Sequence, residues 1–357
     1  MYDIAIIGLG PAGATLARLL NENLNVIAID KKSDTLQSGF EKPCGGLLAT
    51  DAQKALARFN LTLPLSVLIN PQIFSVRTID LASRLIRYYH RFYINLDRHK
   101  FDLWLKSLIP DYIEIHNNAR CKSIERIDEG YRIKWKEDGK DYCIDARCVV
   151  GADGASSSVR RFAYPKADIR RYLSIQQWFK DEHATPFYSC VFDPAITDCY
   201  AWGLSKNEHF IFGGAFPLKN AKKRLDTLKA KLKEYGFHLD NPIKTEICMV
   251  LRPSGLKDFY CGKDNIFLVG EAAGFISPSS LEGISYALNS GYELSRIFNG
   301  GFKNANQKYW RKTFLIRTKL VIKNLKCPFM YAPLLRFLVM KSRIKSLSVI
   351  SNKRTEK

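Results

Sequence analysis

The 357-residue sequence has nine cysteines but no Cys-x-x-Cys pair, and its six histidines form no cluster at metal-ligand spacing. These absences exclude a zinc ribbon and a thioredoxin-like redox motif, so we expect no bound metal. Scattered, odd-numbered thiols are typical of a protein kept in a reducing compartment. Apolar runs of the roughly 18 residues that a membrane-spanning helix requires are also missing. The chain begins almost directly with an apolar run and leaves no room for a signal peptide, which predicts a cytoplasmic location.

Acidic residues are nearly missing from the end of the chain. Residues 302–357 contain fifteen Lys or Arg and one acid, Glu356, so this segment contributes +14 to the total net charge of +20. Basic residues interleave with large apolar ones over 308–325, and 327–340 is apolar apart from Arg336. A basic amphipathic segment of this kind either lies on an anionic membrane surface or packs on the protein and shows its basic face to water. We favour a peripheral contact with the inner face of the cell membrane, and the second alternative stays open.

The first thirty residues carry the clearest motif. An apolar run ends in Gly8-Leu9-Gly10-Pro11-Ala12-Gly13, a helical stretch follows to Asn23, and a second apolar run ends at Asp30. This order is the fingerprint of a dinucleotide-binding βαβ unit, in which Gly8 permits the turn, Gly10 lets the backbone approach a pyrophosphate and Gly13 lets the helix pack closely. An acid at position 30 suits the ribose hydroxyls of FAD or NAD better than the 2′-phosphate of NADP. The alternative is a Gly-rich turn in an ordinary sheet protein.

Three further glycine-containing turns lie later in the chain. Pro43-Cys44-Gly45-Gly46 indicates a backbone pressed against a flat group, with a plain turn as the alternative. A second turn, Gly151-Ala152-Asp153-Gly154, follows an apolar run. The Asp153 carboxylate suits a ribityl hydroxyl or a water-bridged phosphate better than a bare pyrophosphate, which would repel it. Gly270-Glu271 ends another apolar run, and the helix expected near Gly283 would offer backbone donors to a developing anion.

Strands are expected in the middle of the chain. Short runs separated by glycines predict a β-meander over 113–150. Residues 173–217 are the most aromatic part, and alternation places Tyr200, Trp202 and Leu204 on one strand face. These side chains form either a sheet core or the wall of a long apolar cavity.

The three motifs at Gly8–Asp30, Gly151–Arg161 and Gly270–Ala287, taken with the Cys44-Gly45-Gly46 turn, resemble the FAD-dependent oxidoreductases of the para-hydroxybenzoate-hydroxylase-like fold. Within that group the chain is most similar to the geranylgeranyl reductase family, over roughly residues 1–300. The resemblance implies a mixed α/β (α+β) fold, with a Rossmann-like FAD-binding domain, an inserted antiparallel β-sheet domain that binds substrate, and a C-terminal helical segment. The implied ranges are 1–70, 97–165 and 255–300 for the FAD-binding domain, 71–96 and 166–254 for the substrate domain, and 301–357 for the basic amphipathic segment.

The resemblance also implies roles for single residues. Tyr200 and Trp202 would line the substrate channel, and Cys44 is a candidate proton donor, with packing beside the flavin ring as the alternative. Glu271 stands where the family usually has Asp. The residues implied in binding FAD are Gly8, Gly10, Pro11, Ala12, Gly13, Asp30, Cys44, Gly45, Gly46, Arg98, Asp153, Gly154, Gly270, Glu271, Gly274, Gly283 and Ile284.

The activity implied by the resemblance is the reduction of carbon–carbon double bonds in a polyprenyl, geranylgeranyl-type lipid by hydride transfer from reduced FAD. No second Gly-x-Gly-x-x-Gly is present in the sequence, so the electron donor would bind transiently as NAD(P)H or be a ferredoxin. A flavin-dependent monooxygenase acting on an aromatic or lipid compound is the alternative. An RNA-binding flavoprotein is a remote one, because the basic residues lie on an apolar-rich tail rather than among stacking aromatics, and no nucleic acid is expected.

Overall fold

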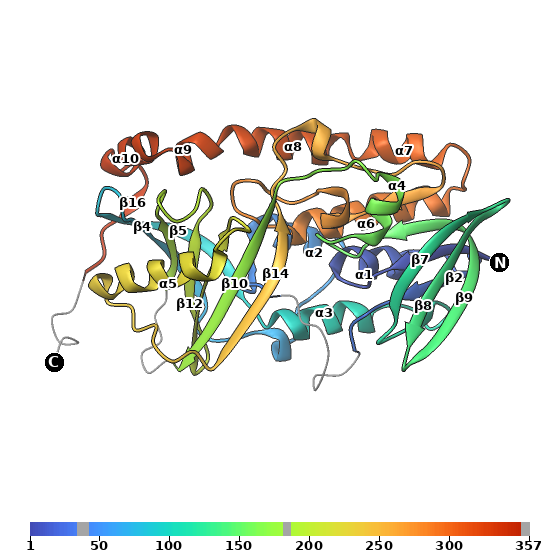
Figure 1. Ribbon diagram of the computed structural model, residues 1–357, viewed down its shortest axis with the longest axis horizontal. Helices are drawn as coiled ribbons and strands as arrows, with labels where there is room; N and C mark the ends of the chain where they lie inside the picture. The colour runs from blue at the N-terminus through green and yellow to red at the C-terminus, as the bar shows by residue number, and fades with distance from the viewer. Residues whose placement is uncertain (34–42, 181–186, 351–357) are drawn as a thin grey trace.

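The computed structural model describes residues 1–33, 43–180 and 187–350, and it contains two β-sheets at the two ends of an elongated molecule (Figure 1). The first sheet has seven strands. Its parallel part has the order β6-β2-β1-β9, and β15 pairs with the last residues of β9. These strands are β1 (Tyr2–Ile7), β2 (Val26–Ile29), β6 (Glu114–His116), β9 (Lys140–Gly151) and β15 (Ile266–Leu268). The apolar runs of β1, β2, β15 and the second half of β9 are buried, as expected for parallel strands covered by helices, whereas the edge strand β6 is partly exposed.

The predicted meander is present in this sheet. β7 (Arg120–Ile127), β8 (Gly130–Glu137) and the first half of β9 pair in antiparallel order. The second half of β9 pairs with β1 in parallel, so one long strand joins the meander to the nucleotide-binding part of the sheet.

Several helices pack against the first sheet. They are α1 (Pro11–Arg18), α2 (Thr50–Arg58), α3 (Arg98–Ser107), α4 (Ser158–Ala163) and α6 (Ile284–Asn299). The sequence predicts that the first helix reaches Asn23, but it ends at Arg18 because the Asn-containing residues after it form a turn. The α1 and α6 helices touch at Gly291, where a Cβ would lie 2.5 Å from the Ala12 carbonyl oxygen. Only glycine permits this separation.

The second sheet has nine strands and curves around the other half of the molecule. Its order is β14-β10-β13-β12-β11-β4-β5-β16, with β3 paired to β5. The pairing is antiparallel apart from β11 and β4, which run parallel. The prediction of an antiparallel sheet is therefore wrong for this one pair. The strands are β3 (Leu47–Leu48), β4 (Ile73–Asp80), β5 (Leu85–Asn95), β10 (Arg171–Lys180), β11 (Phe187–Phe192), β12 (Ala201–Lys206), β13 (His209–Phe216), β14 (Lys244–Leu251) and β16 (Ser346–Leu347).

One helix and four short 3-10 turns complete these two halves. Helix α5 (Ala221–Leu232) packs Leu225, Leu228 and Leu232 on the second sheet against Phe212 and Phe216. The 3-10 turns are η1 (Leu65–Val67), η2 (Lys233–Tyr235), η3 (Leu256–Asp258) and η4 (Gly270–Ala273). The two sheets and their helices confirm the predicted mixed α/β class.

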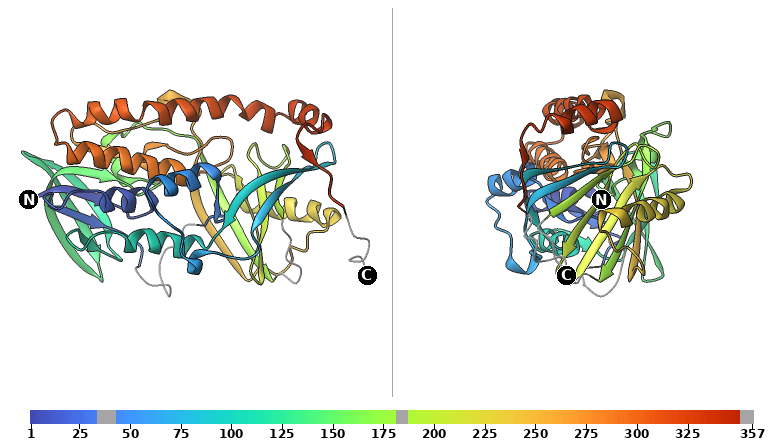
Figure 2. Two further views of the ribbon diagram at one scale, coloured as in Figure 1. Left: turned by 180° about the vertical axis from the view of Figure 1, so that it is seen from behind. Right: turned by 90° about the vertical axis from the view of Figure 1, so that its left-hand side faces the viewer.

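The C-terminal segment runs along one side of both halves (Figure 2). It consists of α7 (Ala305–Lys312), α8 (Phe314–Leu325), α9 (Cys327–Tyr331) and α10 (Pro333–Lys341). The segment is not helical throughout, because β16 pairs with the edge of β5. Among the described residues, no helix combines the length and apolar character needed to cross a bilayer.

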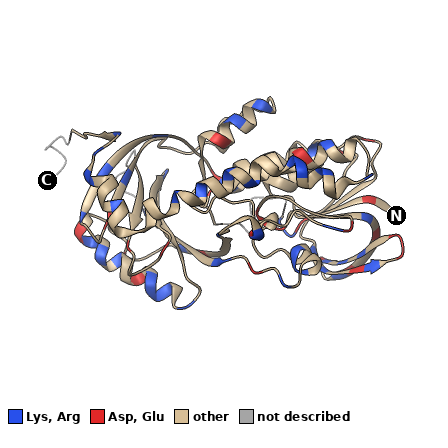
Figure 3. Ribbon diagram, turned by 90° about the horizontal axis from the view of Figure 1, so that it is seen from above, with Lys and Arg blue, Asp and Glu red and all other residues tan. Residues whose placement is uncertain are grey.

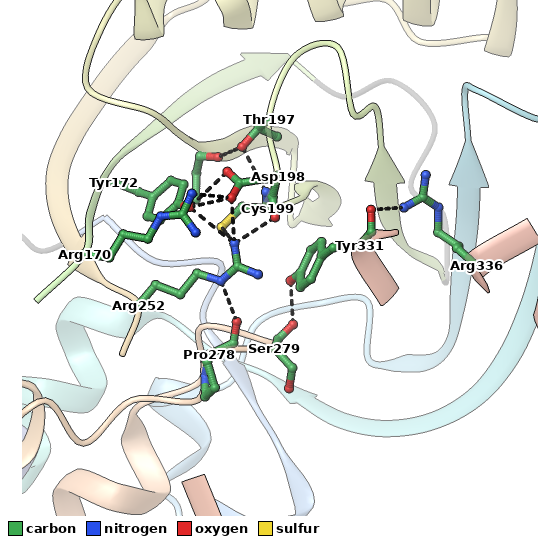
Figure 4. A network of polar contacts seen from close by, with 11 residues as sticks. Arg170, Tyr172, Thr197, Asp198, Cys199, Arg252, Pro278, Ser279, Tyr331 and Arg336 are labelled. Carbon is green, nitrogen blue, oxygen red and sulfur yellow. Dashed lines mark hydrogen bonds and ion pairs between the residues drawn. The ribbon is translucent and has the colours of Figure 1, made fainter. Parts of the chain in front are cut away.

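A buried ion pair fastens this tail to the second sheet. The Arg336 Nη2 atom lies 2.8 Å from Asp80 Oδ1, and their side chains are 5% and 1% exposed. The Nη1 atom of Arg336 also donates to the Met330 and Tyr331 carbonyl oxygens. Nearby, Tyr331 Oη donates to the Ser279 carbonyl oxygen at 2.6 Å, and the Arg252 guanidinium lies 4.5 Å from the centre of the Tyr331 ring (Figure 4). The tail is therefore an integral part of the fold.

We expect Asp80→Asn to lower the free energy of unfolding by roughly 3 kcal/mol, because it leaves the buried Arg336 guanidinium without a counter-charge. The double variant Asp80→Asn/Arg336→Met removes both charges and should lose less stability than the single variant. Urea unfolding measures both. The exposed pair Arg126–Asp264 supplies the control, since Asp264→Asn should cost less than about 1 kcal/mol. Equal losses for Asp80→Asn and Asp264→Asn would contradict this account of the tail.

Candidate functional site

A continuous cavity of about 1090 Å³ runs from the glycine-rich turn after β1, between the two sheets, to the C-terminal helices. Apart from Gly13 and Gly274, every residue that the sequence analysis proposes for the site lies on its wall. The lining continues beyond them to Tyr188, Cys190 and Phe192 on β11 and to Met330, Arg336 and Met340 in the tail. The cavity is therefore longer than the set of predicted residues.

The glycines of the first turn divide into two kinds. A Cβ at Gly8, whose φ is +98°, would lie 2.8 Å from the Ala152 carbonyl oxygen, and one at Gly13 would lie 2.0 Å from the Gly8 carbonyl oxygen. Both are required for the close packing of strand and helix. A Cβ at Gly10 would meet nothing within 4 Å, because Gly10 faces the cavity directly before the N-terminus of α1. This open cradle fits a pyrophosphate bound by helix N–H groups.

Positive charge lines the same end of the cavity. Asp102 receives two cations, with Arg98 Nε 2.8 Å from its Oδ1 atom and Lys32 Nζ 2.6 Å from its Oδ2 atom. Burial disfavours the charged carboxyl, but Arg98 and Lys32 lower the pKa of Asp102 to about 2. Two cations on one carboxylate leave a net positive charge beside the turn, which favours an anionic ligand. Asp30 is buried after β2, and its Oδ2 atom lies 3.3 Å from Lys106 Nζ.

The two carboxylate oxygens of Asp153 have different surroundings. The Oδ2 atom accepts hydrogen bonds from the Ser158 amide at 2.7 Å and the Ser158 hydroxyl at 2.9 Å, at the start of α4. The Oδ1 atom is buried and has no hydrogen-bond partner among the described residues. A buried acceptor without a donor is costly, and a ligand hydroxyl in the cavity would satisfy it. This arrangement fits the ribityl chain that the sequence analysis considered.

Two glutamates at the cavity wall are engaged by backbone donors. Glu271 Oε1 accepts from the Leu251 amide at 3.0 Å, where β14 ends, so the extra methylene relative to Asp lets this carboxylate join the two halves of the molecule. Glu282 Oε1 accepts from the Ser285 amide at 2.7 Å in the first turn of α6, and burial raises the pKa of Glu282. Gly283 and Ile284 line the cavity at this helix start, where one backbone donor is thus already used.

Gly274 packs closely against the backbone of another segment. Its φ is +82°, and a Cβ there would lie 2.4 Å from the Asp258 carbonyl oxygen. The residue lies away from the cavity wall and closes the 3-10 turn η4. The structure therefore places it in backbone packing rather than beside a ligand.

The Cys44-Gly45-Gly46 turn lies at the junction between the charged and the apolar part of the cavity. The Gly46 amide donates to Cys44 Sγ at 3.5 Å, and the Arg98 guanidinium is within hydrogen-bonding reach of the same thiol. A Cβ at Gly45 would lie 3.9 Å from Trp202 Cδ1. Cys44 thus lies between the phosphate-binding end and the aromatic chamber.

Lys206 lies directly behind this turn, and the sequence analysis missed it. Its amine is buried and donates to Asn95 Oδ1 at 2.9 Å and to the Leu96 carbonyl oxygen at 2.7 Å. Gly46 has a φ of +62°, and a Cβ there would lie 2.6 Å from Lys206 Nζ. Burial lowers the pKa of Lys206 to about 8. A lysine at the end of a strand is ordinarily solvated, so nothing in the local pattern indicated this burial.

The far part of the cavity is an aromatic and aliphatic chamber. Tyr200 Oη donates to the Ser280 carbonyl oxygen at 2.7 Å, and Trp202 Nε1 donates to Gln176 Oε1 at 3.3 Å. Both side chains therefore turn their polar atoms to protein partners and their rings to the chamber. Tyr188, Cys190 and Phe192 alternate along β11, and this period of two in the sequence could have identified them.

The buried amine predicts a pH dependence of stability. Because the pKa of Lys206 falls from 10.5 to about 8 on folding, the unfolded chain binds more protons at this residue between these pH values. The free energy of unfolding should therefore rise with pH across the window, by about 3 kcal/mol relative to Lys206→Met. Denaturant titrations at a series of pH values measure this difference. The exposed Lys140→Met is the control and should leave the slope unchanged; an equal slope in Lys206→Met would contradict the burial of a titrating amine.

Comparison with known proteins agrees with this geometry. The family model described as Lycopene cyclase protein matches residues 3–280. Protein CbrA of Shigella flexneri is 53% identical over 341 residues, which cover 96% of this chain and 93% of that protein.

Solved structures share the fold at lower identity. A geranylgeranyl bacteriochlorophyll reductase-like protein from Thermoplasma acidophilum superposes with a TM-score of 0.80 at 19% identity, covering 98% of this chain and 94% of that one. PqsL of Pseudomonas aeruginosa, described as a probable FAD-dependent monooxygenase, gives 0.70 at 16% identity over 96% of this chain and 99% of that one. The chain therefore belongs to the lycopene cyclase protein family and to the CbrA proteins, and it shares the fold of these solved structures.

Proposed function

We propose that this protein is an FAD-dependent reductase that saturates carbon–carbon double bonds of a polyprenyl, geranylgeranyl-type lipid. The observation that carries the proposal is the continuity of the cavity, which leads from a dinucleotide cradle into a chamber whose wall includes Val76, Phe192, Tyr200, Trp202 and Met330. A long apolar chain is the substrate shape and chemistry that such a chamber accommodates.

The residues of the cradle fit FAD. Gly10 leaves room for the pyrophosphate, Arg98 and Lys32 supply positive charge, and the free Oδ1 atom of Asp153 suits a hydroxyl donor. FAD, when bound and reduced, supplies the hydride equivalent for this chemistry, while the protein supplies shape, charge and a dry environment.

Addition of a hydride to an alkene also requires one proton. Cys44 is the candidate donor, because its thiol lies where the cradle meets the chamber. Burial raises the pKa of Tyr200 and of Tyr188 well above the usual value, so these hydroxyls are weaker acids than an exposed tyrosine and are assigned to the wall. The electron donor would be NAD(P)H or a ferredoxin that binds transiently.

A flavin-dependent monooxygenase is the second candidate, and the fold shared with PqsL favours it. The cradle serves both reactions equally. The two differ in their need for oxygen and in the mass of the product.

Gly10 faces the space proposed for the pyrophosphate. Gly10→Ala should lower the affinity for FAD at least tenfold, about 1.4 kcal/mol, because its methyl group would project into the space proposed for the pyrophosphate. The backbone φ of −67° suits alanine, so the unfolding free energy without FAD should change little. Gly255→Ala is the matched control, since a Cβ there also meets nothing within 4 Å and Gly255 lies off the cavity wall. Titration of FAD measured by flavin fluorescence distinguishes the variants, and equal affinities would place the pyrophosphate elsewhere.

Anaerobic turnover tests the proposed reduction of a prenyl double bond. With FAD bound and chemically reduced in the absence of oxygen, the protein should convert a detergent-solubilised geranylgeranyl lipid to products that are heavier by pairs of hydrogen atoms, as measured by mass spectrometry. Gly10→Ala at limiting FAD should be slower, and heat-denatured protein should be inactive. A product that gains an oxygen atom and forms only in air would instead identify the monooxygenase.

A further inference from the structure

The tail has an apolar outer face as well as an apolar inner one. On its inner side Ile316, Leu320 and Met340 are buried against the protein. On its outer side several large apolar side chains have no protein contact that buries them, with exposed fractions between 47% and 68%. They are Phe314, Leu315, Ile322, Leu325, Phe329, Leu334, Leu338 and Val339. Packing on the protein explains only the inner set.

These outer residues share faces of their helices. Leu315, Ile322 and Leu325 on α8 are spaced by seven and three positions, and Leu334 and Leu338 on α10 by four. Both spacings place side chains on one side of a helix. The exposed leucines are therefore gathered in stripes, unlike the isolated apolar side chains that are normal on a surface.

The charge of this face has one sign. Residues 302–350 contain twelve Lys or Arg and no Asp or Glu. Arg336 and Lys323 pair with Asp80 and Asp51, but most of the others are exposed. Figure 3 shows where Lys and Arg occur along the ribbon. The exposed ones are Lys303, Lys308, Arg311, Lys312, Lys319, Lys326, Lys341, Arg343 and Lys345. Lysines and arginines among exposed leucines complement a surface that is both anionic and apolar, as a bilayer of acidic lipids is.

The cavity reaches the surface at this face. Three of its large apolar lining residues are exposed there: Phe92 on β5, Phe329 on α9 and Val339 on α10. The helix α10 lies against β5, where Arg87 Nε donates to the Met340 carbonyl oxygen at 2.9 Å. The opening between β5 and the tail is thus bordered by the same helices that carry the exposed leucines.

We infer that the outer face of α8–α10 docks on an anionic lipid bilayer and that the cavity mouth at Phe92, Phe329 and Val339 admits an apolar chain directly from it. The identity of that chain rests on the proposed function, but the docking surface does not. The exposed leucines would insert into the apolar part of the bilayer, and the basic side chains would attract the acidic headgroups. A lipid would then pass from bilayer to chamber without crossing water.

The test is co-sedimentation of the FAD-loaded, full-length protein with vesicles of phosphatidylglycerol and phosphatidylcholine, compared with vesicles of phosphatidylcholine alone. We expect at least tenfold tighter binding to the acidic vesicles, weakened by salt. The variant Leu325→Asp/Leu338→Asp should bind at least tenfold more weakly than the wild type, since both side chains are exposed and neither lines the cavity. Leu65→Asp/Ile243→Asp carries the same charge change at exposed positions outside the tail and should bind as the wild type does.

Equal binding of the two double variants, or no preference for acidic vesicles, would overturn the inference. A dimer seen by size-exclusion chromatography that Leu325→Asp/Leu338→Asp dissociates, without vesicle binding, would assign the face to a second copy of the chain and also overturn it. Activity separates this inference from the proposed function. Reduction of the lipid in detergent should survive Leu325→Asp/Leu338→Asp while reduction in vesicles falls. Vesicle binding without reduction of any prenyl lipid would leave the docking surface intact and remove the reductase proposal.

Discussion

The buried ion pair between Arg336 and Asp80 is the contact on which the far end of the cavity depends. It joins the last helix to the end of β4 across 256 residues of sequence, with both side chains almost fully buried. Taking two charges out of water is expensive, and the geometry repays the cost only because Asp80 also accepts from Ser83 and Arg336 also donates to two tail carbonyl groups. Without this contact α10 would lose its buried charged anchor on the second sheet, and only the β16 pairing, Arg87 and Tyr331 would hold the part of the tail that brings Met330 and Met340 to the chamber wall.

A different constraint governs the cofactor end. Several carboxylates lie near a cradle that suits a pyrophosphate, and free anions there would repel it. Each one is instead engaged in the fold: Asp153 holds the start of α4, Glu271 holds the end of β14, and Glu282 holds the start of α6. Asp102 is outnumbered by Lys32 and Arg98. The acids therefore position the elements around the cavity, while Lys32 and Arg98 offset the charge of Asp102 and Lys106 offsets that of Asp30.

The sequence could predict features that depend on residues close together in the chain. The βαβ unit follows from glycine spacing, apolar runs and Asp30, and helix α3 starts where Asp97 caps it. Long-range pairing was out of reach. The start of β5 at Leu85 could not be located from the sequence, because its half-exposed side chains are held by β4 and β16 rather than by their own alternation. Arg336 is the one charge in an otherwise apolar stretch, but the sequence analysis did not predict its burial, and no local pattern identifies Asp80 as its partner. Lys206 likewise has partners, Asn95 and Leu96, that are more than a hundred residues away.

The chamber's hydroxyl groups bear on the choice between a reductase and a hydroxylase of aromatic compounds. Recognition of a polar aromatic substrate requires hydrogen-bonding groups that point to the ligand, and sites built this way reject apolar analogues because their own polar atoms would be left unpaired. Here Tyr200, on the cavity wall, donates to the carbonyl oxygen of Ser280, and the hydroxyl of Tyr188, also on the wall, is bonded to Tyr200. Their rings are what the cavity offers a ligand. A wall of this kind discriminates by shape and burial of apolar area, which favours an isoprenoid chain over a hydroxylated ring.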